Sequence, residues 1–186
     1  MRKLTVLMHI SLDGFASGIN GETDWMIHDG GAVFLDADGS DTTNICIFGR
    51  TTYDMMKSFW PSVTDNPESP EGFIAIANWM NNATKYVVSG SLKTSDWENT
   101  LFINNNVVSE VKKLKEISTS NILIMGSISI VHLLAKANLI DEYALTITPV
   151  VLGEGVPLFK QRAEVELTSS KTYPSGVISA NYVVKK

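Results

Sequence analysis

The chain has 186 residues, of which 44% are hydrophobic and 19% charged, and its 15 basic and 20 acidic side chains give a net charge of -5. This composition is typical of a globular domain, and its mild acidity gives no electrostatic reason to bind nucleic acid or a membrane surface. Because the single cysteine, Cys46, can form no internal disulfide and has apolar neighbours, we expect a buried thiol in one cytoplasmic domain over residues 1–186.

Six apolar runs are rich in valine, isoleucine, leucine and threonine, as strands covered on both faces usually are. They span residues 3–10, 44–49, 84–89, 100–103, 121–126 and 142–153. The first run is far shorter than the ~20 apolar residues of a membrane-spanning helix. We therefore interpret all six runs as strands of one sheet.

Helical patterns alternate with these strands. Residues 105–118 and 127–141 each place apolar side chains along one stripe. Residues 51–60 predict a shorter helix that Pro61 stops, and a further helix is expected at about 71–82. Alternation of strands and helices predicts right-handed crossovers and a largely parallel sheet.

The end of the chain has a different pattern. Residues 163–186 contain two alternating runs around Pro174-Ser175-Gly176, which predict an antiparallel hairpin at a sheet edge. Together with the apolar segment 150–159, this edge predicts pairing with a second copy of the chain, and hence a homodimer.

Three predicted strands end in glycine and hydroxyl side chains, at Gly49, at Ser89–Ser91 and at Gly126 with Ser127. The carboxyl ends of parallel strands share one edge, where open α/β sheets bind ligands. The first amides of a following helix attract an anion there, and Arg50 adds a planar cation suited to phosphate. This edge predicts a phosphate-bearing ligand, although each turn alone is also compatible with ordinary turn chemistry and Arg50 with a plain surface charge.

The long loop after the first strand, residues 11–25, carries Gly14, Gly18 and Gly21 among polar residues. A loop of this kind beside the ligand edge is expected to close over a ligand. Asp13 lies where the first strand ends. Its carboxylate either faces the crevice or forms an Asx-turn with Gly14.

The segments "SLDGFAS", "NGETDW", "FGRTTYD", "VVSGS", "ILIMGSIS" and "LIDEYALTITPVVLGEGVPLF" follow one another along nearly the whole chain. In this order they resemble the dihydrofolate reductase superfamily, and most closely the reductase half of the bifunctional riboflavin-biosynthesis deaminase-reductase. The resemblance implies a three-layer α/β fold with a central, mostly parallel eight-stranded sheet, a C-terminal antiparallel hairpin, and NADPH bound across the carboxyl edge of the sheet.

The resemblance also implies site residues. Arg50 would pair with the 2′-phosphate of NADPH, and Thr52 with the backbone after Gly49 would hold the pyrophosphate. The other implied cofactor contacts are Gly18, Asn20, Gly21, Thr51, Ser89, Gly90, Ser91, Gly126, Ser127 and Ile128. On the substrate side would lie Trp25, Gly153 and Gly155, with further pocket residues from helices over 25–36 and 51–60.

The implied activity is an NADPH-dependent reduction of a small heterocycle, pteridine-like or ribitylaminopyrimidine-like. Asp13 would orient this substrate, and Asp29 is a second candidate for proton supply. The alternative is a nucleotide-binding module without turnover, because Ser127 replaces a second glycine that the family usually has, and the pterin-binding acid is missing.

Other chemistries find little support in the sequence. The chain lacks the H-x-E and P-C-x-x-C motifs of zinc deaminases, and its histidines have no metal-ligand spacing, so neither deamination nor a metal site is expected. His9 on the first strand and His132 in a helix are expected to be satisfied structural residues. Only His28 lies near the predicted crevice.

Overall fold

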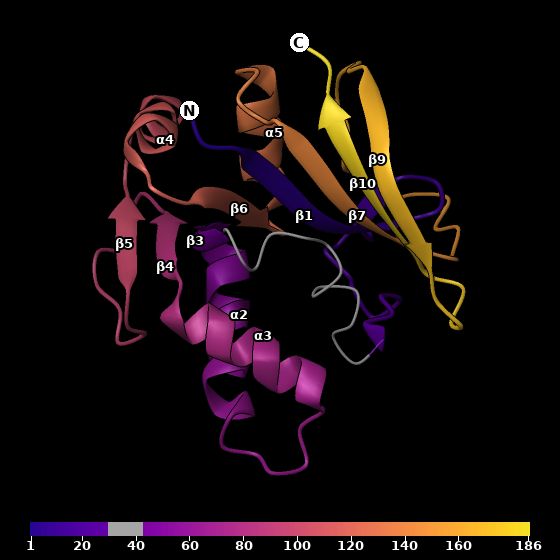
Figure 1. Cartoon of the computed structure of the whole chain (residues 1–186), viewed down its shortest axis with the longest axis horizontal. Coiled ribbons are helices and arrows are strands. Elements are labelled where there is room, and N and C mark those ends of the chain that lie inside the picture. The colour runs from indigo at the N-terminus through magenta and orange to yellow at the C-terminus, as the bar shows by residue number, and fades with distance from the viewer. Residues whose placement is uncertain (30–42) are drawn as a thin grey trace.

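An eight-stranded sheet forms the centre of the computed structural model, which describes residues 1–29 and 43–186 (Figure 1). Its strands are β1 (Leu4–Ser11), β3 (Thr43–Gly49), β4 (Thr84–Val88), β5 (Thr100–Ile103), β6 (Asn121–Met125), β7 (Glu142–Thr148), β9 (Val165–Thr172) and β10 (Ile178–Val184). They lie in the order β5-β4-β3-β6-β1-β7-β10-β9. All neighbours from β5 to β7 are parallel, whereas β10 is antiparallel to both β7 and β9. The predicted sheet and hairpin are confirmed.

Helices cover both faces of the sheet, as Figure 1 shows. They are α2 (Arg50–Val63), α3 (Glu71–Asn82), α4 (Val107–Ile117) and α5 (Ile128–Lys136). On one face, Phe48 packs in an apolar cluster with Tyr53 of α2 and Met80 of α3. On the other face, Ile47 belongs to a cluster that includes Val111 of α4 and Leu134 of α5. Alternate residues of the same strands therefore serve two cores, which accounts for their continuous apolar sequences.

Three expected boundaries are wrong. Pro61 lies inside α2 instead of ending it, because the helix stops at Val63 and the missing proline N–H affects only the last turn. The strand expected over 142–153 ends at Thr148, since Pro149 cannot donate to a sheet ladder. The helix expected over 127–141 also ends early, at Lys136.

The structure contains a small second sheet that the sequence did not predict. Within the loop expected over 11–25, β2 (Phe15–Ser17) pairs antiparallel with β8 (Val156–Pro157). Gly155 precedes β8, and a side chain there would collide with the carbonyl oxygen of Ser17. The helix expected over 25–36 lies mostly outside the described residues, and none of the described helices has the length and apolar character needed to cross a bilayer.

A buried lysine stabilises the end of α3. Lys85 of β4 is fully buried, and its Nζ donates to the carbonyl oxygens of Met80, Ala83 and Asn81 at 2.9, 2.8 and 3.2 Å. The same Nζ lies 4.6 Å from the ring centroid of Trp97. These contacts satisfy carbonyls that the helix end leaves without intrahelical partners, so they fix α3 against β4.

The C-terminal hairpin provides one edge of the sheet. Every residue of β9 is exposed, including Val165 and Leu167, and the turn before β10 contains Gly176 with a φ of 86°. Since β9 has a neighbour on one side only among the described strands, its outer backbone edge is open for pairing in this part of the structure.

Candidate functional site

Three neighbouring strands end at the same edge of the sheet. Because β4, β3 and β6 are adjacent and parallel, Gly49 at the end of β3 lies between Ser89–Ser91, which follow β4, and Gly126–Ser127, which follow β6. We call these three turns the rim. The juxtaposition expected from the sequence is confirmed. The other predicted cofactor residues here are Thr51 and Thr52 in α2, Gly90 after β4 and Ile128 at the start of α5.

Side chains link the three turns of the rim. The Gly49 amide donates a 2.8 Å hydrogen bond to Ser127 Oγ, which joins β3 to the turn after β6. Arg50 Nη1 donates to Ser91 Oγ at 2.8 Å, which joins α2 to the turn after β4. The Arg50 side chain stays 57% exposed, and its Nε lies 3.6 Å from Asp54 Oδ2. Its guanidinium is therefore oriented at the edge of the rim and open to solvent.

The turn after β6 has a strained backbone. Gly126 and Ser127 both have left-handed φ values, 62° and 61°. A Cβ on Gly126 would approach Thr52 Cγ2 to 3.0 Å. Serine rarely adopts this conformation, so Ser127 reproduces the backbone of a glycine at a cost of about 1–2 kcal/mol, partly offset by its hydrogen bond from Gly49.

The two helices that begin at the rim have an unusual charge pattern. Neither α2 nor α5 has an acidic residue in its first turn, whereas α3 begins with Glu71 and α4 has Glu110 there. The amino end of a helix carries a partial positive charge that acidic residues normally complement. At the rim no acidic side chain in the first turn of α2 or α5 balances this charge, and Arg50 adds to it.

Ser89 has a structural role in its turn. Its Oγ accepts from the Leu92 amide at 3.0 Å, and its carbonyl oxygen accepts from Asn104 Nδ2 at 2.6 Å. Gly90 beside it is exposed, with open space where a side chain would be. Of the turn after β4, Gly90 and Ser91 are therefore the parts available to a ligand.

The loop after β1 closes on itself. Gly21, with a φ of 89°, donates its amide to the Gly18 carbonyl at 3.1 Å, and Glu22 accepts from the Asn20 amide and side chain at 2.9 and 2.8 Å. Trp25 Nε1 donates to the Glu22 carbonyl at 3.1 Å. No hydrogen bond within residues 1–29 and 43–186 joins this loop to the rim, so its predicted contact with a cofactor stays a prediction.

Asp13 holds the segment before β8. Its two carboxylate oxygens accept from the amides of Leu152 and Gly153 at 3.2 and 2.8 Å, so the carboxylate does not form the alternative Asx-turn with Gly14. A hydrogen bond from Ser11 and those from the two amides lower the pKa of Asp13, and together they outweigh the opposing effect of desolvation. The carboxylate is therefore ionised at neutral pH and positions Gly153, one of the residues expected on the substrate side.

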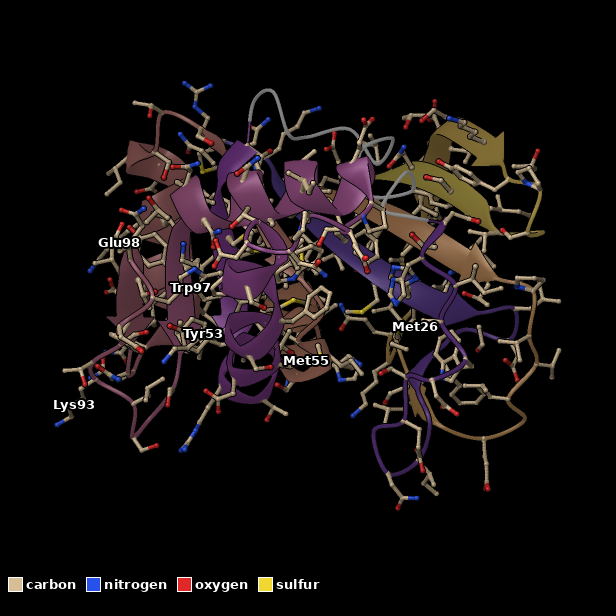
Figure 2. The ribbon with its side chains drawn as sticks, turned by 90° about the horizontal axis from the view of Figure 1, so that it is seen from below. Met26, Tyr53, Met55, Lys93, Trp97 and Glu98 are labelled. Carbon is tan, nitrogen blue, oxygen red and sulfur yellow. The ribbon has the colours of Figure 1, made fainter. Side chains whose placement is uncertain are left out.

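Asp29 faces the C-terminal hairpin. Its Oδ2 accepts a 2.7 Å hydrogen bond from Ser175 Oγ in the turn between β9 and β10, and its backbone has a φ of 43°. In Figure 2, Met26 of the same segment lies on one side of Met55 of α2, and Tyr53 of α2 lies on the other side. The predicted role of Asp29 in proton supply is not tested by this arrangement.

The prediction that His9 is a satisfied structural residue is wrong. This mostly buried side chain has an Nδ1 without a hydrogen-bond partner in the described part of the chain, and its ring packs edge-to-face on His28 with centroids 4.9 Å apart. Burial, with a smaller contribution from His28, lowers the pKa of His9 to about 4. His132, in contrast, is structural as expected, because its Nε2 lies 2.9 Å from the Pro157 carbonyl oxygen.

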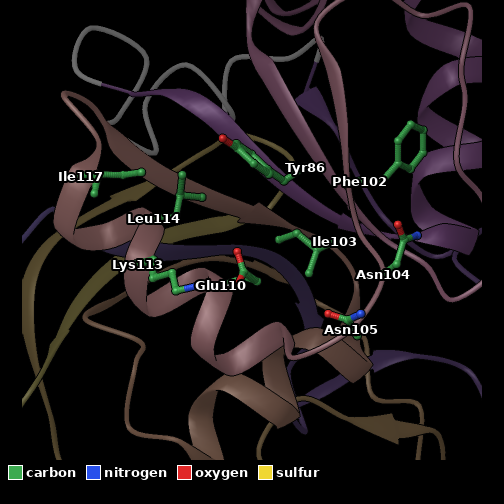
Figure 3. A pocket seen from close by; sticks show the side chains of 9 residues that line it. All are labelled: Tyr86, Phe102, Ile103, Asn104, Asn105, Glu110, Lys113, Leu114 and Ile117. Atoms are coloured by element: carbon green, nitrogen blue, oxygen red, sulfur yellow. Dashed lines mark hydrogen bonds and ion pairs between the residues drawn. The ribbon is translucent and has the colours of Figure 1, made fainter.

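A separate groove lies on the face of the sheet that α4 covers, between α4 and the strands β4 and β5 (Figure 3). Its volume is about 360 Å³, and Tyr86, Leu114 and Ile117 contribute to its lining. Glu110 and Lys113 of α4 form an ion pair at 2.9 Å along it. This groove shares no residue with the rim.

Comparison with known proteins gives a consistent result. The family model of the RibD C-terminal domain matches residues 2–179. Protein YyaP of Bacillus subtilis (strain 168) is 34% identical over 184 residues, which cover 97% of this chain and 94% of YyaP. A solved structure of a protein from Shewanella sp. PV-4, assigned to riboflavin biosynthesis, superposes with a TM-score of 0.70 at 21% identity, over 100% of both chains. A pyrimidine reductase-like protein from Corynebacterium diphtheriae gives 0.66 at 13% identity, over 100% of this chain and 92% of that one.

Proposed function

Because this chain belongs to the RibD C-terminal domain family, we propose that it is an NADPH-dependent reductase of a small pteridine-like or ribitylaminopyrimidine-like heterocycle. Membership of this family supports an oxidoreductase. The observation that carries the proposal is the meeting of two helix amino ends without acidic residues at the rim, beside the exposed guanidinium of Arg50.

The rim fits the anionic parts of a dinucleotide. The amino ends of α2 and α5, joined through Gly49 and Ser127, would hold the pyrophosphate. Arg50, oriented by Ser91, would bind the 2′-phosphate, because a planar guanidinium pairs with phosphate oxygens in a bidentate manner. When bound, NADPH supplies the hydride, and the chain contributes binding and orientation.

The substrate side would adjoin the segment that Asp13 holds. The ionised carboxylate fixes the backbone of Leu152 and Gly153, so it acts on the substrate by placing this segment. The proposal of a pyrimidine-like or pteridine-like substrate is supported by the family and by the resemblance of the fold to a pyrimidine reductase-like protein.

Nucleotide titration tests the proposal. Purified protein is titrated with NADPH and with NADH, and nicotinamide fluorescence reports binding. We expect NADPH to bind at least about tenfold more tightly than NADH, and Arg50→Ala to remove this preference. Arg162→Ala is the matched control, since this highly exposed arginine pairs only with nearby Glu164 among the described residues. Equal affinity for the two nucleotides, or none for either, would refute the proposal.

A nucleotide-binding module without turnover is the second candidate. It is favoured by the internal engagement of Asp13, because both of its carboxylate oxygens already accept from backbone amides. Tight NADPH binding without oxidation in the presence of pteridine and ribitylaminopyrimidine compounds would support it.

A further inference from the structure

The face of the sheet that α2 and α3 cover changes character from one side to the other. Under the helices its side chains are apolar and belong to one cluster: Leu7, Cys46, Phe48, Leu123 and Met125. Farther along β1 and on β7 and β10, the residues of the same face are polar: His9, Ser11, Thr146, Thr148 and Ser179. We call these five residues the polar face. The four hydroxyl residues among them are buried.

The register of the strands places these residues in two rows. His9 is the partner of Thr146 on β7, which in turn is the partner of Ser179 on β10, and Ser11 is the partner of Thr148. With a rise of about 3.3 Å per residue and a strand spacing of about 4.8 Å, the Cα atoms of His9 and Thr148 are about 8 Å apart. Their side chains can therefore reach the two ends of one small ring system.

Two atoms of the polar face lack hydrogen bonds. His9 Nδ1 and Thr148 Oγ1 are buried and have no partner among the residues that the structure describes. Ser11, in contrast, accepts from the Phe15 amide at 3.0 Å. Buried polar atoms without partners are rare because each costs desolvation free energy. Two of them on adjacent strands indicate that an external molecule completes their hydrogen bonding.

The polar face adjoins the rim. The Gly126 amide donates to the Leu7 carbonyl at 3.2 Å, and His9 follows Leu7 by two residues on the same face of β1. A molecule on the polar face would thus lie next to the turn that would hold the nicotinamide end of a dinucleotide.

We propose that the polar face is the floor of the substrate site, where His9 Nδ1 and Thr148 Oγ1 hydrogen-bond the edge of a neutral, planar heterocycle. The proposal rests on the proposed function and specifies its substrate side. None of the five residues carries a charge when His9 is neutral, so this floor offers no positive charge to balance a carboxylate or phosphate group and favours a neutral ligand. A neutral imidazole and a hydroxyl can each donate or accept, which matches the alternating donors and acceptors of a pterin or a uracil edge.

Isosteric substitutions test the proposal. Thr148→Val and His9→Phe remove the two polar atoms while keeping shape, and Thr168→Val is the matched control, because Thr168 on β9 donates only to the nearby Asn181 carbonyl in the described structure. Calorimetric titration of the protein, loaded with NADP⁺, measures binding of pterin, pterin-6-carboxylate and 5-amino-6-ribitylaminouracil. We expect at least one neutral heterocycle to bind the wild type, and each of the two variants to weaken it about tenfold or more.

A readout besides heterocycle binding separates this role from a structural one. Since Thr148 Oγ1 has no partner in the described chain, Thr148→Val is expected to leave the melting temperature unchanged or raise it, whereas loss of a structural hydrogen bond would lower it. The dinucleotide affinity of both variants should equal that of the wild type.

Each outcome has one meaning. Unchanged heterocycle affinity in both variants, absence of binding of either neutral compound to the wild type, or a preference for pterin-6-carboxylate would overturn the inference. Failure of the wild type to bind NADPH would instead refute the proposed function, and is read in a separate titration.

Discussion

Acidification from pH 7 to pH 5 tests whether the fold keeps His9 neutral. Burial, with a smaller repulsion from His28, lowers the pKa of His9 from 6.5 to about 4. Between these values the unfolded chain binds a proton and the folded protein does not, so stability falls as the pH drops through this window. With these two pKa values, the free energy of unfolding decreases by about 2 kcal/mol between pH 7 and pH 5.

Urea unfolding at several pH values, followed by tryptophan fluorescence, measures this loss. For a urea m-value of about 2 kcal/mol/M, the midpoint should move by about 1 M. His9→Phe should remove most of the shift, and the remainder is expected from His28, whose pKa is also lowered by burial. The control is His132→Gln, which keeps a donor beside the Pro157 carbonyl and should retain the dependence of the wild type.

Acidic side chains do not obscure this test. Hydrogen bonds from Lys115 and Lys186 lower the pKa of Asp141 despite the opposing effect of burial, so its contribution is lost only below its ordinary pKa of about 3.8. A His9→Phe protein that still loses about 2 kcal/mol between pH 7 and pH 5 would refute the assignment of the effect to His9.

Three further predictions concern stability, the rim and assembly. Lys85→Met should lower the free energy of unfolding by about 2–4 kcal/mol, because the Met80 and Ala83 carbonyls lose a buried donor; Lys113→Met, at an exposed ion pair, should change it by less than about 0.5 kcal/mol in the same urea experiment. Gly126→Ala should cost about 1–2 kcal/mol and weaken NADPH binding, as measured by thermal unfolding and titration, and unchanged values would contradict the described backbone. Sedimentation equilibrium should give twice the chain mass of 20.4 kDa, with Leu167→Glu on the open edge restoring the monomer; a monomeric wild type would exclude the predicted dimer.

The sheet and its crossovers could be predicted because their causes are local. Apolar runs such as 44–49 and 121–126 serve two cores, and the amphipathic stripe of 105–118 identifies α4. Element ends were less predictable. Whether Pro61 ends a helix depends on how many turns follow it, and the β2–β8 pair depends on contact between segments far apart in the sequence.

The rim was predictable and the polar face was not. Glycine and hydroxyl residues at strand ends such as Gly49 are visible in the sequence, and topology alone brings them to one edge. His9 gives no such signal, because whether its buried Nδ1 finds a partner depends on the tertiary surroundings, which the sequence does not show. The alternation of Leu7, His9 and Ser11 in β1 was the available clue, since it places two polar residues on a face that begins apolar.

The burial of Cys46 has a practical consequence. It is the only cysteine of the chain, it is fully buried, and burial raises its pKa far above the ordinary value, opposed only by nearby Lys85. Because the thiolate is the nucleophile that reacts with thiol reagents, maleimide dyes should not label the native protein. A cysteine introduced at Gly90, where a side chain meets open space, would then be the single labelling position. Its fluorophore would report ligand binding from beside Ser91, the hydrogen-bond partner of Arg50, and Cys46 would not need to be replaced.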